Sequence, residues 1–299
     1  MAPGQREDQL VGASVLEQGE RRRIARRGVG IFLIALIALS APAMAFAVIA
    51  KNDIGVLLLM WAPGLAALIA RLILHEGFAD ISLRLGGRRS WWALLIGLGY
   101  PVAIAVAAYG VGWASGLAQF TSPAGSSSGW VSFGGELLVG VGLGTAVGLV
   151  FALGEELGWR GYLLTRLIDA EVPQPILVSG LIWAAWHLPL IIGGSYLTGN
   201  GGSVPVIALL FVVQVTVVSY VFARLRLDTG SIWPVVVLHA SWNSVIQSVF
   251  DPHTTGSHAW LWLGEQGVLT LAANVIGVLI LYRWPGRLLR QPPTYSPAR

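Results

Sequence analysis

The sequence predicts an all-α protein, a polytopic transmembrane bundle of about eight helices. Of the 299 residues, 55% are hydrophobic and only 11% are charged, whereas an ordinary soluble domain has roughly 25% charged residues. Mean hydropathy is +0.69. Apolar runs of about 20 residues, the length that crosses a bilayer as a helix, recur along the chain. These three observations favour a membrane protein over a water-soluble globule.

The apolar runs are separated by short polar or glycine-containing segments, so that each can form one spanning helix. The fifth run is short and is followed by Gly193 and Gly194. The eight runs cover residues 29–50, 54–74, 91–113, 133–153, 176–193, 204–224, 231–250 and 264–283.

No repeat and no second soluble domain is visible, so we expect one helical membrane domain. Its parts are a basic N-terminal segment (1–28), N-terminal helices (29–132), a helical core (133–250), and a last helix with a basic tail (251–299). In the fourth run, Gly140, Gly144 and Gly148 form a stripe along one helix face, which we interpret as a packing surface for a neighbouring helix.

The positive charges predict the orientation of the bundle. Of the 19 Lys and Arg residues, all but Lys51 lie before the first run, or at or after the end of an even-numbered run. The positive-inside rule then places both termini in the cytoplasm of a cell-membrane protein. Because the basic residues flank membrane spans and form no single patch, a nucleic-acid partner is not expected.

The N-terminal region has two interpretations. A basic stretch, an apolar run and Ala43-Met44-Ala45 resemble a cleavable secretory signal, but the 28 residues before the apolar run are long for such a leader. We therefore expect the first helix to be retained.

The chain has no cysteine, which excludes disulfides, thiolate catalysis and cysteine-ligated metals.

Ionisable groups inside apolar helices are costly and mark functional candidates. Glu155, Glu156 and Arg160 follow the fourth run. Glu156 and Arg160 have the i,i+4 spacing of a helical ion pair, whereas Glu155 points about 100° away and can face the bundle interior.

Two further polar groups lie in later runs. His187 follows Trp183 by one turn in the fifth run, and His239 and Asn243 share a helix face in the seventh. Polar groups on apolar helices can satisfy one another only by converging. We expect them to meet in the inner half of the bilayer, in a cavity open to the cytoplasm.

A glutamate, two histidines and an asparagine in a dry pocket suit peptide hydrolysis. A buried carboxylate can act as general base on water, while imidazole and amide groups can stabilise an oxyanion. The sequence has neither a Gly-x-Gly-Asp aspartate nor a His-Glu-x-x-His zinc motif, which are the marks of two other intramembrane protease chemistries.

This order of motifs resembles the CPBP family of type II CAAX prenyl endopeptidases and bacterial Abi, or bacteriocin-processing, proteins. The resemblance rests on Glu-Glu-x-x-x-Arg at 155–160, an aromatic-x-x-x-His at 183–187 and His-x-x-x-Asn at 239–243, within residues 133–250. One departure is Trp183, where many members carry Phe.

The resemblance implies an intramembrane endopeptidase that acts on a membrane-associated peptide or a lipidated protein. By resemblance, Glu155 and His187 activate water, and His239 and Asn243 stabilise the oxyanion. Glu156 and Arg160 support the site. Members have also been described as metal-dependent, so that Glu155, His187 and His239 are candidate zinc ligands; the cofactor is either absent or zinc.

Two other function classes stay open. Buried acids and histidines also build proton relays in transporters, although the polar residues here cluster near one leaflet. The same fold can also serve as a non-catalytic immunity or scaffold protein.

Overall fold

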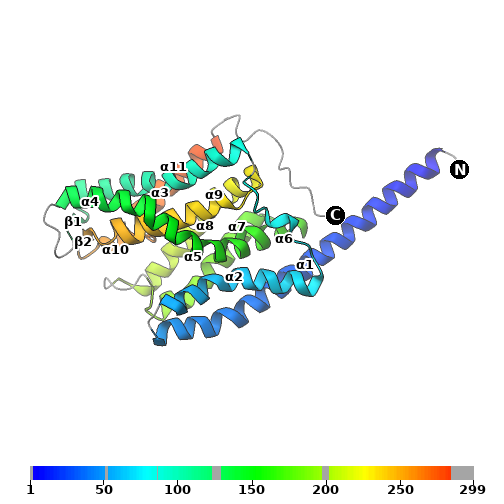
Figure 1. Cartoon of the computed structure of the whole chain (residues 1–299), viewed down its shortest axis with the longest axis horizontal. Helices are drawn as coiled ribbons and strands as arrows, with labels where there is room; N and C mark the ends of the chain where they lie inside the picture. Colours follow the sequence, from blue (N-terminus) through cyan, green and yellow to red (C-terminus); the bar gives the residue numbers. More distant parts are fainter. Residues whose placement is uncertain (1–2, 51–52, 86, 123–128, 197–201, 284–299) are drawn as a thin grey trace.

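The computed structural model describes residues 3–50, 53–85, 87–122, 129–196 and 202–283, and the side chains of these apart from 3–15, 50, 53 and 79. It is an all-α bundle with one minimal strand pair, β1–β2, which joins Gln119 to Thr255 and Phe120 to Thr254 (Figure 1). The predicted fold class is confirmed.

The elements follow one another along the chain as α-helices that are interrupted at several points by one turn or more of 3₁₀- or π-helix. They are α1 (Pro3–Ala50), α2 (Asp53–Leu74), η1 (Ala79–Ile81), α3 (Arg88–Ala114), β1 (Gln119–Phe120), α4 (Gly129–Val139), η2 (Gly140–Gly144), α5 (Thr145–Gly158), η3 (Trp159–Leu163), α6 (Leu164–Asp169), α7 (Pro175–Ile192), α8 (Val204–Thr229), α9 (Trp233–Trp242), η4 (Asn243–Phe250), β2 (Thr254–Thr255), α10 (Ala259–Trp262) and α11 (Val268–Arg283).

The helices are long and apolar enough for a multi-pass membrane protein. By length and composition, six helical segments of the described chain can cross a membrane, and α11 is a shorter apolar helix. The seventh predicted run is divided between α9 and η4. The six segments are Leu16–Ile49, Ile54–Leu74, Arg88–Ala114, Gly129–Asp169, Pro175–Ile192 and Val204–Thr229.

The order of helix packing places α5 and α9 inside the bundle. The α1–α2 hairpin packs through α2 on α5, and α5 packs on α9. On the other side of α9 lies α3, while α7 packs on α8 and α11 closes against both α3 and α8. The N-terminal part of α1 extends away from the bundle (Figure 1).

Glycines of η2 and α5 allow this helical segment to approach α2, α9 and η4 closely. A Cβ on Gly154 would lie 2.8 Å from the Met60 carbonyl oxygen of α2, and one on Gly148 would lie 3.3 Å from the Ala240 Cβ of α9. One on Gly144 would lie 2.2 Å from the Ser244 Oγ of η4. The predicted glycine stripe is therefore a packing surface, and it holds the helix that carries Glu155 close to the helix that carries His239.

Candidate active site

A cavity of about 270 Å³ lies in the middle of the bundle. Four of the six predicted site residues line it: Glu155 from α5, His187 from α7, His239 from α9 and Asn243 from η4. Glu156 and Arg160 are buried behind the lining, with 0% and 2% of their surface exposed. Side chains that are separated by up to 88 residues in the sequence thus share one pocket. The other lining residues are Ala47, Val48, Val56, Leu59, Met60, Trp183, Trp186, Leu190, Ser195, Tyr196, Phe211, Gln214, Val215, Val218, Phe222, Trp242, Gln247 and Glu265.

Two tryptophans hold the Glu155 carboxylate. The indole nitrogens of Trp159 and Trp183 each donate a hydrogen bond of 3.1 Å to its Oε2. Trp159 lies one turn further along the same helical segment, and Trp183 comes from α7. Because both bonds go to one oxygen, Oε1 is left to bind a water or a substrate group in the cavity.

Glu156 faces away from the cavity and joins two cationic side chains. Its carboxylate accepts hydrogen bonds of 2.9 and 3.2 Å from Arg160 Nη1, and its Oε1 also lies 2.8 Å from His239 Nδ1. A carboxylate can only accept in such a pair, so Nδ1 of His239 carries the proton. Nε2 of His239 therefore remains for the cavity.

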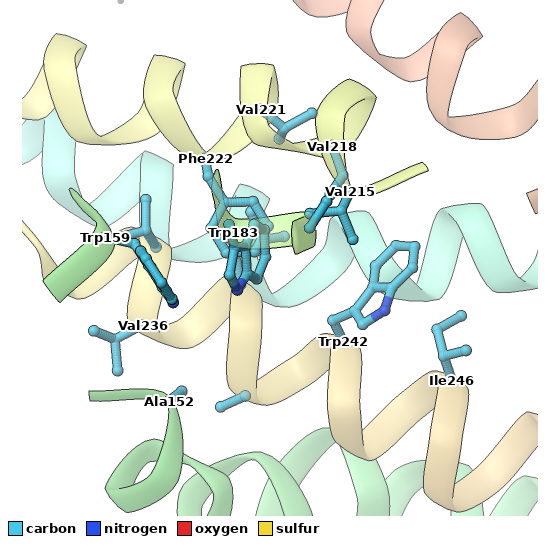
Figure 2. Close-up of a cluster of buried hydrophobic side chains, with 14 of the residues drawn as sticks. Ala152, Trp159, Trp183, Val215, Val218, Val221, Phe222, Val236, Trp242 and Ile246 are labelled. Carbon is cyan, nitrogen blue, oxygen red and sulfur yellow. The ribbon is translucent and has the colours of Figure 1, made fainter. Parts of the chain in front are cut away.

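Aromatic rings enclose the Arg160 guanidinium. Its carbon lies 4.0 Å from the ring centroid of Trp183 and 4.2 Å from that of Phe222, within cation–π range. Figure 2 shows Trp183 and Phe222 close together in the buried cluster between α8 and α9. The two rings and Arg160 fill the bundle on this side of the cavity.

His187 is fixed by its own helix and by neighbouring rings. Its Nδ1 lies 3.0 Å from the Trp183 carbonyl oxygen one turn earlier, and since a carbonyl only accepts, Nδ1 is the protonated nitrogen. The ring packs edge-on against Trp186 and Phe211, with centroids 4.7 and 5.2 Å away. Nε2 is thereby left as a base in the neutral tautomer.

Asn243 and Arg160 both lie in π-helical turns. Asn243 begins η4, and its Oδ1 accepts a long hydrogen bond of 3.4 Å from Gln247 Nε2, which leaves its amide N–H₂ for the cavity. Arg160 lies in η3. Such π-turns frequently occur at functional sites because they change the side-chain register of a helix.

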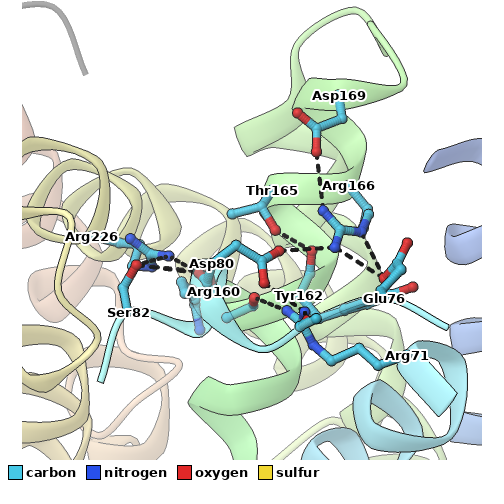
Figure 3. Close-up of polar contacts among 12 residues, drawn as sticks. Arg71, Glu76, Asp80, Ser82, Arg160, Tyr162, Thr165, Arg166, Asp169 and Arg226 are labelled. Carbon is cyan, nitrogen blue, oxygen red and sulfur yellow. Dashed lines mark hydrogen bonds and ion pairs between the residues drawn. The ribbon is translucent and has the colours of Figure 1, made fainter. Parts of the chain in front are cut away.

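A polar network of largely buried side chains surrounds η3 (Figure 3). Arg226 Nε donates to the Arg160 carbonyl at 3.2 Å, and Arg71 Nη2 donates to the Gly161 carbonyl at 3.2 Å. Asp80 binds Arg71 at 2.5 Å and Arg166 at 2.8 Å. Arg71 and Arg226, which the sequence presents only as flanking charges, donate to carbonyls of the π-turn that carries Arg160.

Residues 136–245 match the family model described as Type II CAAX prenyl endopeptidase Rce1-like. The segment contains all six predicted site residues. The match supports the resemblance to the CPBP family. A match to this family model supports the activity of a CAAX-type intramembrane endopeptidase. No curated protein sequence matches the chain at a significant level.

The side chains that would hold a zinc ion in a metal-dependent CPBP protein do not form such a site here. Within the described part of the chain, no three His, Cys, Asp or Glu side chains are grouped closely enough to hold a metal ion. Glu155, His187 and His239 line one cavity, but their side chains are not close enough to one another to bind a single ion. The residues as placed do not fit a three-ligand zinc site.

The cavity extends toward the end of the bundle at which α1 meets α2. Its lining includes Ala47 and Val48 from the last turn of α1, Val56 from α2, and Ser195 after α7. Arg160 and its aromatic neighbours fill the opposite end, where the basic residues lie. The expectation that the cavity opens to the cytoplasm stays a prediction, and the lining residues named here lie toward the end of the bundle away from the basic residues.

Sequence reasoning missed a second carboxylate of the cavity, Glu265. It accepts a hydrogen bond of 2.6 Å from Trp242 Nε1 and another from the Tyr196 hydroxyl. Burial and the Glu265 charge raise the pKa of Tyr196 above its usual range, so its phenol stays protonated and donates. The sequence signal that could have identified Glu265 is its position as an acid at the edge of the last apolar run.

Proposed function

We propose that the protein is an intramembrane endopeptidase that cleaves a peptide bond of a membrane-associated peptide or a lipidated protein by metal-free, glutamate-dependent hydrolysis. One observation carries this proposal: Glu155, His187, His239 and Asn243, from three separate helical segments, line the same cavity.

In the first step, Glu155, with His187 beside it, takes a proton from a water molecule held in the cavity. The resulting hydroxide attacks the carbonyl carbon of the scissile peptide bond. A general base in a largely dry site accelerates such a step by roughly 10²–10⁴-fold.

The negative charge that develops on the carbonyl oxygen needs hydrogen-bond donors. The free amide of Asn243 is one donor. His239 is the other when Nε2 is also protonated, and the charge of Glu156 on its Nδ1 side favours this imidazolium. Preorganised donors of this kind stabilise a tetrahedral intermediate by several kcal/mol.

The intermediate then collapses and the C–N bond breaks. The leaving amine receives the proton that Glu155 took from water, and the products are a carboxylate and an amine. Glu156 and Arg160 do not touch the substrate in this scheme; they hold His239 and the helix turn in place.

The lipid bilayer and the size of the cavity define the substrate class. A volume of about 270 Å³ is near the lower end for ligand pockets, so it accommodates a short extended segment and no folded domain. The substrate therefore presents a flexible peptide from the membrane. The enclosed Arg160 end also argues against a transport path through the whole bilayer.

The test uses purified protein in detergent or bicelles with a library of fluorogenic peptides, with and without a lipid anchor, and mass spectrometry of the products. We expect wild-type protein to cleave one peptide class, and Glu155→Gln and His187→Asn to lose cleavage while they keep the wild-type unfolding temperature. His258→Ala, in an exposed loop, is the matched control and should cleave normally.

Three results would overturn the proposal or a part of it. Cleavage that survives both substitutions removes the catalytic assignment. Substrate-dependent flux in proteoliposomes without any cleavage would instead support a transporter. Wild-type activity that is lost on chelation and restored by zinc would refute the metal-free mechanism.

A further inference from the structure

The α8 wall of the cavity carries one polar side chain. Residues 211, 214, 215, 218 and 222 follow one another at spacings of one, three or four and line the cavity from one helix face. Phe211, Val215, Val218 and Phe222 are apolar, and Gln214 is the exception.

Gln214 is buried without a hydrogen-bond partner. Only 2% of its surface is exposed, and within the described part of the chain neither Nε2 nor Oε1 has a partner. Buried polar atoms are nearly always paired, because leaving one unpaired forfeits its hydration. An apolar residue would suit the wall better if the wall only had to pack. The amide therefore requires a partner from outside the chain.

Gln214 lies near the His187 end of the site. Phe211, three residues earlier, packs on His187 with centroids 5.2 Å apart, whereas Phe222, eight residues later, packs on His239 at 5.8 Å. At a rise of about 1.5 Å per residue, Gln214 is about 4.5 Å along α8 from Phe211 and about 12 Å from Phe222.

The chemistry of the side chain matches a peptide backbone. A primary amide both donates and accepts, as does a peptide group with its N–H and C=O. Successive residues of an extended peptide are about 3.3 Å apart. A substrate whose scissile carbonyl lies beside His187 would therefore bring a neighbouring peptide group to the level of Gln214.

We propose that Gln214 is a substrate-binding residue that hydrogen-bonds a backbone peptide group beside the scissile bond. The proposal rests on the proposed endopeptidase function. Such a contact selects an extended backbone and is independent of side-chain identity, while Val215 and Val218 provide an apolar wall for the neighbouring side chains.

The first arm of the test compares Gln214→Leu with Thr216→Val. Thr216 is on the same helix and its buried hydroxyl also lacks a partner in the described chain, but it does not line the cavity. We expect Gln214→Leu to keep or raise the unfolding temperature and to lower kcat/KM roughly 10- to 100-fold, mainly through KM. Thr216→Val should keep wild-type kinetics.

The second arm changes the substrate. Each peptide N–H next to the scissile bond is replaced in turn by an ester oxygen, which leaves the scissile amide intact. At one position we expect the ester to lower kcat/KM of the wild type but to have little further effect on Gln214→Leu, which is the coupling that a direct contact produces.

The outcomes distinguish this inference from the proposed function. Wild-type protein that cleaves no peptide would refute the endopeptidase function. Wild-type cleavage combined with unchanged kinetics of Gln214→Leu would overturn the role of Gln214 alone. A Gln214→Leu variant that unfolds at lower temperature with normal kcat/KM would show a structural role, and uncoupled ester effects at every position would exclude the backbone contact.

Discussion

The adjacent carboxylates Glu155 and Glu156 point into two different environments, and each environment assigns a different task. Glu155 accepts from two neutral indoles and lines the cavity. Glu156 is fully buried between Arg160 and His239. One acid is thus available to a substrate, and the other neutralises buried positive charge.

Substitution by glutamine should separate these tasks. Glu155→Gln keeps an oxygen that can accept from both indoles, so its free energy of unfolding should change by less than about 1 kcal/mol. Glu156→Gln leaves the buried Arg160 without a full counter-charge and should lose about 3–5 kcal/mol. Denaturation in detergent, together with peptide cleavage, measures both effects. Equal losses of stability in the two variants would contradict the division.

Asp251, just beyond η4, predicts a pH dependence of stability. Burial is the main cause that raises the pKa of Asp251 from 3.8 to about 7 in the folded protein, and the charge of Glu265 adds to it. The Tyr109 hydroxyl, which donates to its Oδ1, opposes the shift. Between these two pKa values the folded state binds a proton that the unfolded state has lost.

Stability should therefore be highest at the acidic end and fall as pH rises from about 4 to about 7, with no further contribution from Asp251 above that. Three pKa units correspond to on the order of 4 kcal/mol, as an upper limit. Asp251→Asn should remove this slope and make the protein more stable than wild type at pH 8. Unfolding temperatures of both proteins across pH 4–8 test this, and parallel curves would refute it.

At the scale of elements, the crossing of α2 and α5 decides where the two glutamates lie. A Cβ on Gly158 would approach the Pro63 Cβ to 2.4 Å and its carbonyl carbon to 2.5 Å. Backbone cannot yield as a flexible side chain can, so the two helices would have to separate.

Gly158→Ala should therefore lower the free energy of unfolding by about 1–3 kcal/mol and reduce activity, because Glu155 and Glu156 shift with α5. The matched control is Gly134→Ala in α4, where a Cβ meets nothing within 4 Å and higher helix propensity favours alanine. Unfolding and cleavage assays on both variants measure the contrast. A Gly158→Ala protein as stable and active as the control would show that the close crossing is dispensable.

At the scale of the whole molecule, periodic patterns predict more than irregular contacts do. The apolar runs predict the helical bundle, and the glycine stripe predicts the packing of α5 on α9 and η4. The i,i+4 spacing predicts the pairing of Glu156 with Arg160. These features follow from one helix geometry that applies along the whole chain.

Features that depend on tertiary contacts could not be derived in this way. The indole donor Trp183 and Glu155 lie on different elements, as do Tyr196 and Glu265. The unpaired Gln214 amide depends on what packs around α8. The π-turns η3 and η4 leave no clear mark in the sequence. The direction of the cavity follows from which large rings fill one end of the bundle, and composition carries no information about that.

The charge pattern and the cavity together make a prediction about membrane sidedness. If both termini are cytoplasmic, as the positive charges predict, the cavity extends toward the outer face, near Ser195. His75, after α2, then lies on the cytoplasmic face.

Labelling of single cysteines tests this orientation. Ser195 and His75 are both exposed, and the chain has no cysteine of its own, so a cysteine introduced at either position gives a clean signal. In intact cells, a membrane-impermeant maleimide should label Ser195→Cys, whereas His75→Cys should react only after permeabilisation. The reverse pattern would place the basic end outside and turn the cavity toward the cytoplasm. Because Ser195 lines the cavity, the side that labels Ser195→Cys is also the side toward which the cavity extends.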